Sequence, residues 1–280
     1  MRELGLRLIA KYVWLEWLLL SVLRRYYELM FVMSSEIVLI HSIGKVGSST
    51  LQESLKKRGR LVVHTHFLNK DNVLFWKRYY TNSPRRAAPM HIYRGRAIAG
   101  ILDKTNKDIR IITPFREPVS REFSSLFQDN RVYPELLGDV NQALGVLEKI
   151  GGRLAKELPE ERWINLELKQ TLGFDIYKEN FPFAKGYITL EKDNKKILVF
   201  RLENLESLFP SVFDDFLLTF AGRLINVNVG AQKAYSDRYM AIRDEKMLSE
   251  NEIRAIQNQQ FWRWMYSDFD RKLRTRWGKE

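Results

Sequence analysis

The stretch from Glu36 to Leu55 constrains what this chain can fold into more than any other part of its 280 residues. Ile37 to Ile40 is a short apolar run rich in β-branched residues, which is typical of a buried parallel strand. A loop with two glycines follows at once, and Leu51 and Leu55 then restart apolar spacing four residues apart. The pattern therefore predicts a strand, a glycine-containing loop and a helix, in that order.

This loop has the composition of an anion-binding turn. Unpaired amides at a helix N-terminus would point into it, and the helix dipole favours negative charge there. Gly44 and Gly47 let the backbone approach a ligand, Lys45 adds positive charge, and the hydroxyls of Ser48 to Thr50 can donate hydrogen bonds. In a Walker A loop, which holds a nucleoside triphosphate and Mg²⁺, the lysine follows the second glycine, whereas position 48 here is Ser. A turn that binds no ligand is the alternative.

Composition restricts the class of protein and the kind of partner. The chain has no cysteine, which excludes disulfides and cysteine-based zinc sites and fits a reducing compartment. A net charge of +12 points to anionic partners such as nucleotide, acidic glycan, nucleic acid or lipid headgroups. No nucleic-acid-binding motif accompanies that charge, so we expect no nucleic-acid partner. The length suits one α/β domain with insertions.

Residues 1–33 predict an amphipathic helical segment ahead of an α/β domain at 34–280. Trp14, Trp17 and the cluster Leu18 to Leu20 are flanked by basic residues, but the run is interrupted by Glu16 and is too short to span a bilayer. No small-residue cleavage site follows, which argues against a signal peptide. The segment could pack on the body of the protein or lie on a membrane surface, and Met33 leaves open a later start. We expect a cytoplasmic protein, with peripheral contact to the inner face of the membrane as the alternative.

Leu61 to Phe67 predicts a second strand that carries two histidines. His64 and His66 are two residues apart, so strand periodicity puts both on one face. The carboxyl ends of parallel strands face the ligand crevice in α/β folds, and both histidines lie at that end. A histidine of near-neutral pKa is a plausible general base, and His66, nearer the strand end, is the favoured one. A pair of hydrogen-bonded structural histidines is the alternative; His91, further on, is interpreted as structural.

A second anion receptor is predicted after Ile109 to Phe115, the third strand. Arg116 stands at its carboxyl end, Pro118 suits the first helical position, and Ser124 lies two turns into the helix. An arginine fixed beside a helix N-terminus binds anions, and a nearby serine can complete the site. One molecule with two phosphates would explain both anion sites.

These motifs resemble the sulfotransferase superfamily, whose members use 3′-phosphoadenosine 5′-phosphosulfate (PAPS). IGKVGSSTL, from Ile43 to Leu51, is similar to the loop that cradles the 5′-phosphosulfate in that family. REPVSREFS, from Arg116 to Ser124, matches the family's arginine and serine eight positions apart, which bind the 3′-phosphate. The resemblance implies a donor site made of Lys45, Val46, Gly47, Ser48, Ser49, Thr50, Arg116 and Ser124.

The resemblance also implies catalytic roles. The HTH of His64 to His66 is similar to the histidine-bearing pattern of uronyl-type glycan sulfotransferases, whereas many other members use Glu as the base. His66 would take the proton of the acceptor hydroxyl, with His64 as the second candidate. Lys45 would neutralise charge on the bridging oxygen as the sulfuryl group leaves. This scheme requires no metal, and adenosine 3′,5′-bisphosphate (PAP) is the product.

Looser similarity extends over about residues 36–275. Lys196 to Leu205 resembles a later core strand of the family with its Arg-x-Glu-x-Leu ending, and Tyr266 to Leu273 resembles the terminal helix of many members. Trp163 to Asp175 is similar to bacterial capsular-polysaccharide sulfotransferases, with Trp163 itself interpreted as core. Asn226 to Tyr235 is a basic loop whose Lys233 could close over the nucleotide; a plain surface loop is the alternative.

The spacing of apolar residues predicts the remaining helices, and a turn signal predicts a hairpin. Helices are predicted over 71–80, 92–102, 138–159 with a break at the glycines 151 and 152, 203–220 and 261–277, and a hairpin around the turn at 193–194. The fold class is therefore α/β, a P-loop-like three-layer fold with a central, mostly parallel sheet, helices on both faces and helical insertions.

The expected activity is transfer of a sulfuryl group from PAPS to a hydroxyl of a carbohydrate or polysaccharide acceptor. The alternatives are a nucleotide-dependent phosphotransferase, and a non-catalytic basic protein that binds acidic glycan. The first would require Mg²⁺ ligands and a lysine after Gly47. The second would not explain why the chain has both the motif from Ile43 to Leu51 and the motif from Arg116 to Ser124.

Overall fold

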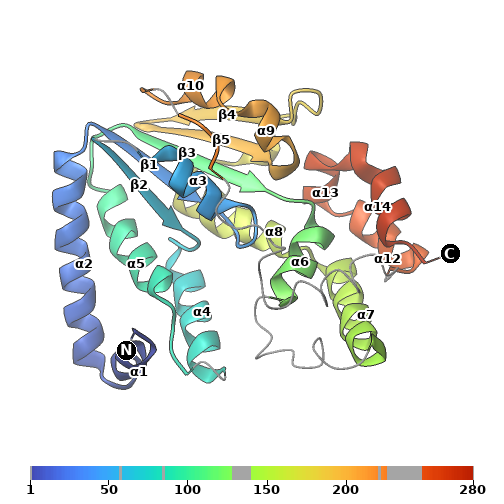
Figure 1. Cartoon of the computed structure of the whole chain (residues 1–280), viewed down its shortest axis with the longest axis horizontal. Coiled ribbons are helices and arrows are strands. Elements are labelled where there is room, and N and C mark those ends of the chain that lie inside the picture. The colour runs from blue at the N-terminus through green and yellow to red at the C-terminus, as the bar shows by residue number, and fades with distance from the viewer. Residues whose placement is uncertain are drawn as a thin grey trace.

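The structure is a computed structural model that describes residues 2–56, 59–83, 86–127, 140–219, 222–225 and 248–279. Within these residues five strands form one sheet in the order β2-β1-β3-β5-β4 (Figure 1). Their bounds are β1 Glu36–His41, β2 Arg60–Thr65, β3 Ile109–Phe115, β4 Tyr187–Lys192 and β5 Lys195–Arg201. β2, β1, β3 and β5 are parallel, and β4 joins the edge antiparallel to β5 through the predicted hairpin. The predicted α/β class with a mostly parallel sheet is confirmed.

Alternation along β1 explains why the sheet is covered on both faces. Ile37 and Leu39 lie in one hydrophobic core, and Val38 and Ile40 lie in another. The first core also takes in side chains of α2 Val13–Met33, α5 Met90–Leu102, α7 Val140–Lys156 and α12 Glu250–Gln257. The second contains side chains of α3 Ser48–Leu55 and α10 Ser211–Phe216. A strand buried on both sides needs a continuous apolar run, which is what the sequence provides.

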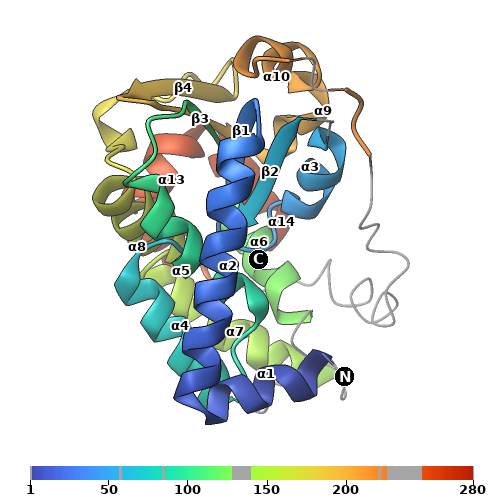
Figure 2. The same ribbon diagram turned by 90° about the vertical axis from the view of Figure 1, so that its left-hand side faces the viewer.

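The other helices surround this framework and the carboxyl edge of the sheet. They are α1 Arg2–Lys11, α4 Lys70–Asn82, α6 Pro118–Leu126, α8 Pro159–Trp163, the π-helix Ile164–Thr171, α9 Leu205–Leu208, α13 Gln260–Met265 and α14 Asp270–Trp277, with 3₁₀ turns at Ile176–Lys178, Leu202–Asn204 and Ser267–Phe269. The N-terminal segment forms two helices, α1 and α2, separated at Tyr12, and α2 runs along one side of the molecule (Figure 2).

Three expectations about helices are wrong. α7 continues through Gly151 and Gly152, because its buried stripe of Ala143, Leu147 and Leu154 offsets the roughly 1 kcal/mol that each glycine costs a helix. The helix expected over 203–220 is a 3₁₀ turn, α9 and α10, interrupted at Pro210, which has no amide to donate. The helix expected over 261–277 is divided into α13, a 3₁₀ turn and α14.

Candidate active site

Three turns from neighbouring strands meet at the carboxyl edge of the sheet. β2 ends one residue before His66, β1 leads into the loop with Lys45, and β3 ends at the residue before Arg116. β1 lies between β2 and β3 and pairs with both in parallel, so the three turns leave the sheet at the same edge (Figure 1). Because adjacent strands lie about 4.8 Å apart, the three turns are neighbours. The structure thus brings together the segments that the sequence singled out.

The loop after β1 has the backbone of an anion-binding turn. Lys45 and Gly47 both have a left-handed φ of 73°, on either side of the fully buried Val46. Left-handed residues in such a turn direct successive amides toward one point, which makes a concave anion receptor. Gly47 is also the residue before α3, and a Cβ there would lie 2.8 Å from Leu202 Cδ1. Glycine therefore suits this position by its left-handed backbone, and it also lets Leu202 approach closely.

The turn after β3 is fixed by Glu117, which caps α6. Its carboxylate accepts hydrogen bonds from the Val119 and Ser120 amides at 2.7 and 2.9 Å, and Trp277 Nε1 also donates to it at 3.3 Å. Burial raises the pKa of Glu117 despite these bonds, and the nearby Glu203 adds to the increase. α6 begins at Pro118 as predicted. The capped turn holds Arg116 at the sheet edge, where it makes no hydrogen bond or ion pair to another described residue.

The Arg-x-Glu-x-Leu ending of β5 connects this turn to the C-terminal helices. Glu203 Oε1 accepts a hydrogen bond from the Glu117 amide at 2.9 Å, and Glu203 Oε2 accepts one from the Tyr266 hydroxyl at 3.2 Å. Arg201 is buried, binds both carboxylate oxygens of Asp268 at 2.9 and 2.6 Å, and donates to the Met265 carbonyl at 2.8 Å. The stretches Lys196 to Leu205 and Tyr266 to Leu273 therefore support the Arg116 turn.

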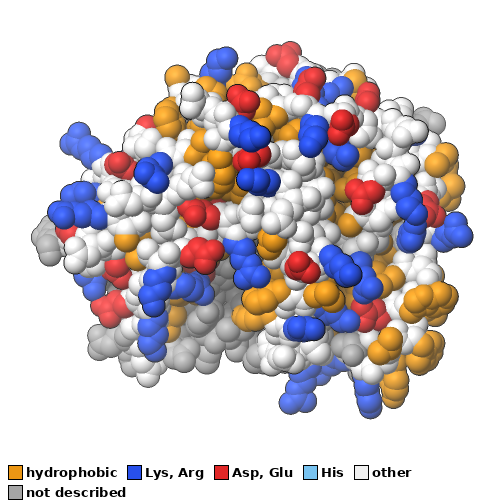
Figure 3. Space-filling view, turned by 180° about the vertical axis from the view of Figure 1, so that it is seen from behind, with side chains coloured by type: hydrophobic (Ala, Val, Ile, Leu, Met, Phe, Trp, Pro, Cys, Tyr) orange, Lys and Arg blue, Asp and Glu red, His pale blue; other side chains and the backbone are white. Residues whose placement is uncertain are grey.

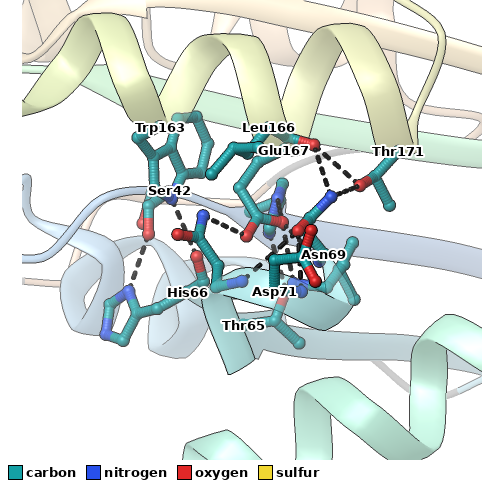
Figure 4. A network of polar contacts seen from close by, with 12 residues as sticks. Ser42, Thr65, His66, Asn69, Asp71, Trp163, Leu166, Glu167 and Thr171 are labelled. Atoms are coloured by element: carbon teal, nitrogen blue, oxygen red, sulfur yellow. Dashed lines mark hydrogen bonds and ion pairs between the residues drawn. The ribbon is translucent and has the colours of Figure 1, made fainter. Parts of the chain in front are cut away.

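His66 contacts the loop after β1 directly. Its Nδ1 lies 2.7 Å from the Ser42 carbonyl oxygen (Figure 4). Since a carbonyl only accepts, the proton is on Nδ1 and the lone pair is on Nε2. Burial lowers the pKa of His66, although the bond to Ser42 opposes this. At neutral pH the ring is therefore neutral, in the tautomer whose Nε2 can accept a proton.

The four histidines of the chain gather around this point. The rings of His64 and His66 lie edge to face with centroids 4.4 Å apart, and His91 packs against His66 at 5.0 Å. Burial, with His66 and His91 nearby, lowers the pKa of His64 to about 2. His64 Nε2 is buried with no hydrogen-bond partner among the described residues, so this ring is less suited than His66 to meet a substrate. His91 lies beside the candidate base, and its structural role stays a prediction.

A buried carboxylate that the sequence reasoning missed lies beside the turn that follows the strand with His64. Glu167, in the π-helix, accepts hydrogen bonds from the Leu68 and Asn69 amides at 2.7 and 2.9 Å and from Asn72 Nδ2 at 2.8 Å (Figure 4). Its carboxylate also lies 3.3 Å from His41 Nε2. Burial alone would raise the pKa of Glu167, but the bonds from His41, Asn72 and Leu68 together lower it. The carboxylate is therefore ionised and holds the turn from β2 to α4.

His41 and Trp163 complete this support. His41 Nδ1 lies 2.9 Å from Thr65 Oγ1, and Trp163 Nε1 donates to the His66 carbonyl at 2.8 Å (Figure 4). The indole is buried, as predicted for Trp163. Two signals in the sequence could have pointed to this network: a histidine ends the buried β1 run, and an acid interrupts an otherwise core-facing segment.

Two cavities have charged and polar side chains in their lining. A cavity of about 230 Å³ lies beside the Arg116 turn, between α6 and α14, and its lining includes Glu117, Ser120, Lys272 and Arg276. A larger one of about 400 Å³, lined by Asn69, Asp103 and Lys195 among others, includes none of the predicted site residues. Across the described ranges no group of three or more acidic or histidine side chains could hold a metal ion.

The remaining predicted donor-site residues lie on α6, on α3 or outside the described residues. Ser124 is partly exposed on α6, in the third turn after Arg116. Ser48, Ser49 and Thr50 form the first turn of α3, directly after Gly47. Lys233, with the rest of the basic loop predicted at 226–235, lies outside the described residues.

Comparison with known proteins adds a biological context. Residues 135–267 match the model of the NKWYS family, described as "Putative capsular polysaccharide synthesis protein". The matched part contains the π-helix with Glu167, the β4–β5 hairpin, Glu203 and Tyr266, but not the turns with Lys45, His66 and Arg116. The match supports a context of polysaccharide synthesis. No curated protein and no solved structure matches the chain.

Proposed function

We propose that this protein is a PAPS-dependent sulfotransferase that transfers a sulfuryl group to a hydroxyl of a carbohydrate acceptor in polysaccharide biosynthesis. The observation that carries the proposal is the order of the three turns along one sheet edge: His66 after β2, the Lys45 loop after β1, and Arg116 after β3. A nucleotide with phosphates at its 5′ and 3′ positions could contact the second and third turns together. The base would then stand on the other side of the loop that holds the 5′ end.

Each group of residues has a role that follows from its charge. The amides around Gly47 and the hydroxyls of Ser48 to Thr50 bind the 5′-phosphate, and Lys45 stabilises negative charge on the bridging oxygen. Arg116 and Ser124 bind the 3′-phosphate and fix the register of the nucleotide. His66 accepts the acceptor proton at Nε2, because Nδ1–H is already bonded to Ser42. PAPS supplies the activated sulfuryl group for this transfer.

The carbohydrate class of the acceptor rests on the family match and on aromatic side chains beside the histidines. Tyr80 packs near His91 with ring centroids 6.1 Å apart, and Trp76 and Tyr79 continue the row along α4 at 5.9 and 5.5 Å from Tyr80. Phe75 and Tyr79 are exposed. Exposed aromatic rings can cover the apolar faces of sugars while leaving their hydroxyls to polar groups.

A thermal-shift experiment tests the donor assignment. PAP at 100 times its Kd should stabilise the protein by about 2.7 kcal/mol, which raises the Tm by several degrees, whereas ATP with Mg²⁺ should have little effect. Equal stabilisation by both would favour the phosphotransferase instead. No stabilisation by either would favour a glycan-binding protein without catalysis.

The same experiment on two arginine variants tests whether Arg116 binds the nucleotide. Arg116→Ala should remove most of the stabilisation by PAP, because the 3′-phosphate loses its charge-assisted bonds. Arg263→Ala removes an exposed arginine of α13 and serves as the matched control, which should respond to PAP like the original protein. If both variants respond equally, Arg116 does not bind the nucleotide.

A further inference from the structure

A stripe of large apolar side chains runs along the outer face of α2. We define this outer face by Trp14, Trp17, Leu18, Val22, Leu29 and Val32, all of which are exposed. Trp14 and Trp17 have exposed fractions of 64% and 70%, and Val32 of 72%. The helix has 21 residues, so the stripe extends about 30 Å. Single exposed apolar residues are ordinary, but a continuous stripe of this length indicates a binding surface.

The opposite side of α2 is fixed to the protein, so the stripe cannot turn inward. Tyr27 and Phe31 are buried in the main core, where α2 packs against α5. The buried Glu16 pairs with Lys77 of α4 at 2.5 Å and with Arg96 of α5 at 3.0 Å. Rotating the helix would expose this carboxylate network and part of the core. Figure 2 shows α2 outermost on this side of the molecule.

Charge on and beside the stripe is basic. Arg25, with a side chain 87% exposed, lies within the stripe. Arg24 lies next to it on α2, and Arg7 and Lys11 are on α1. Of the two acids of α2, Glu16 is buried and Glu28 is paired with both Arg24 and Arg25. In Figure 3 apolar side chains gather along the edge where α2 lies, with Lys and Arg among them. This face is therefore mainly apolar, with one exposed arginine within it and further basic residues beside it.

We propose that the outer face of α2 binds the surface of an anionic lipid bilayer. Tryptophan rings suit the boundary between headgroups and acyl chains, and arginine stems can lie along apolar surface while the guanidinium reaches lipid phosphates. A helix that lies in the interface plane presents an apolar face to the lipid. In α2 this is the outer face, and the opposite face packs on the body of the protein. No helix in the described part of the chain is long and apolar enough to cross a membrane.

Co-sedimentation of the full chain with vesicles tests this proposal. The protein should bind vesicles of phosphatidylcholine with phosphatidylglycerol, bind pure phosphatidylcholine vesicles more weakly, and lose part of the difference at high salt. Trp14→Ser with Trp17→Ser should weaken binding about tenfold or more, since two exposed rings no longer enter the interface. Arg25→Glu with Lys11→Glu should abolish the preference for the anionic lipid.

Controls separate this outcome from loss of folding and from dimer formation. Leu218→Ser removes an exposed apolar side chain elsewhere and should bind vesicles like the original protein. Unchanged circular dichroism and Tm of the double tryptophan variant would show that it folds. Equal vesicle binding by that variant would overturn the proposal. So would a dimer, measured by light scattering, that this variant converts to monomer, because the face would then be an interface between two copies.

Discussion

The hydrogen bond from His66 to the Ser42 carbonyl decides which nitrogen can act as a base. Because Nδ1 donates at 2.7 Å, only Nε2 has a lone pair to offer. The bond also orients the ring relative to the loop with Lys45, so the candidate base is in direct contact with the loop that carries the candidate donor site. His66 could be singled out from the sequence by its place at a strand end, but its tautomer depends on the carbonyl of Ser42, in the loop after β1.

His66→Ala should lower turnover by about 10²-fold or more and leave PAP binding unchanged. His64→Leu is the matched comparison and should lose less activity, because its Nε2 is buried. A larger loss in His64→Leu than in His66→Ala would assign the base to His64. Turnover of the original protein should also persist below pH 6.5, since the lowered pKa of His66 keeps the ring neutral there. Initial rates with labelled donor over a pH series measure both effects.

His64 makes stability depend on pH. Its folded pKa of about 2 lies below its usual value of 6.5, so protons bind more readily to the unfolded chain between these limits. The stabilisation is complete above pH 6.5 and is lost as the pH falls, by roughly 1 kcal/mol per unit for this one group. Urea unfolding of the original protein and of His64→Leu at pH 7.5 and 5.5 measures it. The original protein should lose about 1 kcal/mol more than the variant on acidification; equal losses would contradict the assignment.

At the scale of elements, the π-helix and the turn from β2 to α4 depend on each other. Glu167 satisfies two backbone amides and the Asn72 side chain of that turn, in a place from which water is excluded. Removing one partner of a buried charged network lowers the free energy of unfolding by more than the intact network adds to it, because the remaining polar groups are left buried and unpaired.

Glu167→Ala should therefore lower the free energy of unfolding by about 3 kcal/mol, and Glu167→Gln by less, since the amide retains one acceptor oxygen. Glu157→Ala, at an exposed acid near the end of α7, is the control and should change stability by less than about 0.5 kcal/mol. Chemical unfolding at neutral pH measures all three. If Glu167→Ala and Glu157→Ala behave alike, the carboxylate is not a structural support.

The elements also show which parts of the fold could be predicted from the sequence. β1, the glycine loop and the start of α6 follow from local patterns. A strand buried on both faces needs an apolar run, a positive φ favours glycine, and proline suits the first position of a helix. The continuity of α7 does not follow from local patterns. Its glycines predict a break, whereas the apolar stripe that keeps it helical packs on α12, a helix far away in the chain. The Glu167 network could not be derived, because its partners are about 100 positions away in the chain.

On the scale of the whole molecule, the candidate donor site is formed by turns of the central sheet, and residues of the C-terminal region contact and support these turns. The sheet brings the Lys45 and Arg116 turns to one edge, and the segment after β5 joins both of them. Leu202 packs on Gly47, and Glu203 binds the Glu117 amide and the Tyr266 hydroxyl. Arg201 and Asp268 then connect this segment to the start of the last helix. The part matched by the family model thus supports the part that carries the predicted donor site.

This coupling predicts that a residue without nucleotide contact affects nucleotide binding. Glu203→Ala should weaken PAP binding about fivefold, close to 1 kcal/mol, because the Glu117 amide loses its acceptor and the Arg116 turn loosens. Glu203→Gln keeps an acceptor oxygen and should restore most of the affinity, and Glu206→Ala, at an exposed acid one helical turn away, should bind like the original protein. Isothermal titration with PAP distinguishes the three variants. If Glu203→Ala binds as tightly as Glu206→Ala, the C-terminal region does not control the Arg116 turn, and the turn is rigid by virtue of the Glu117 cap alone.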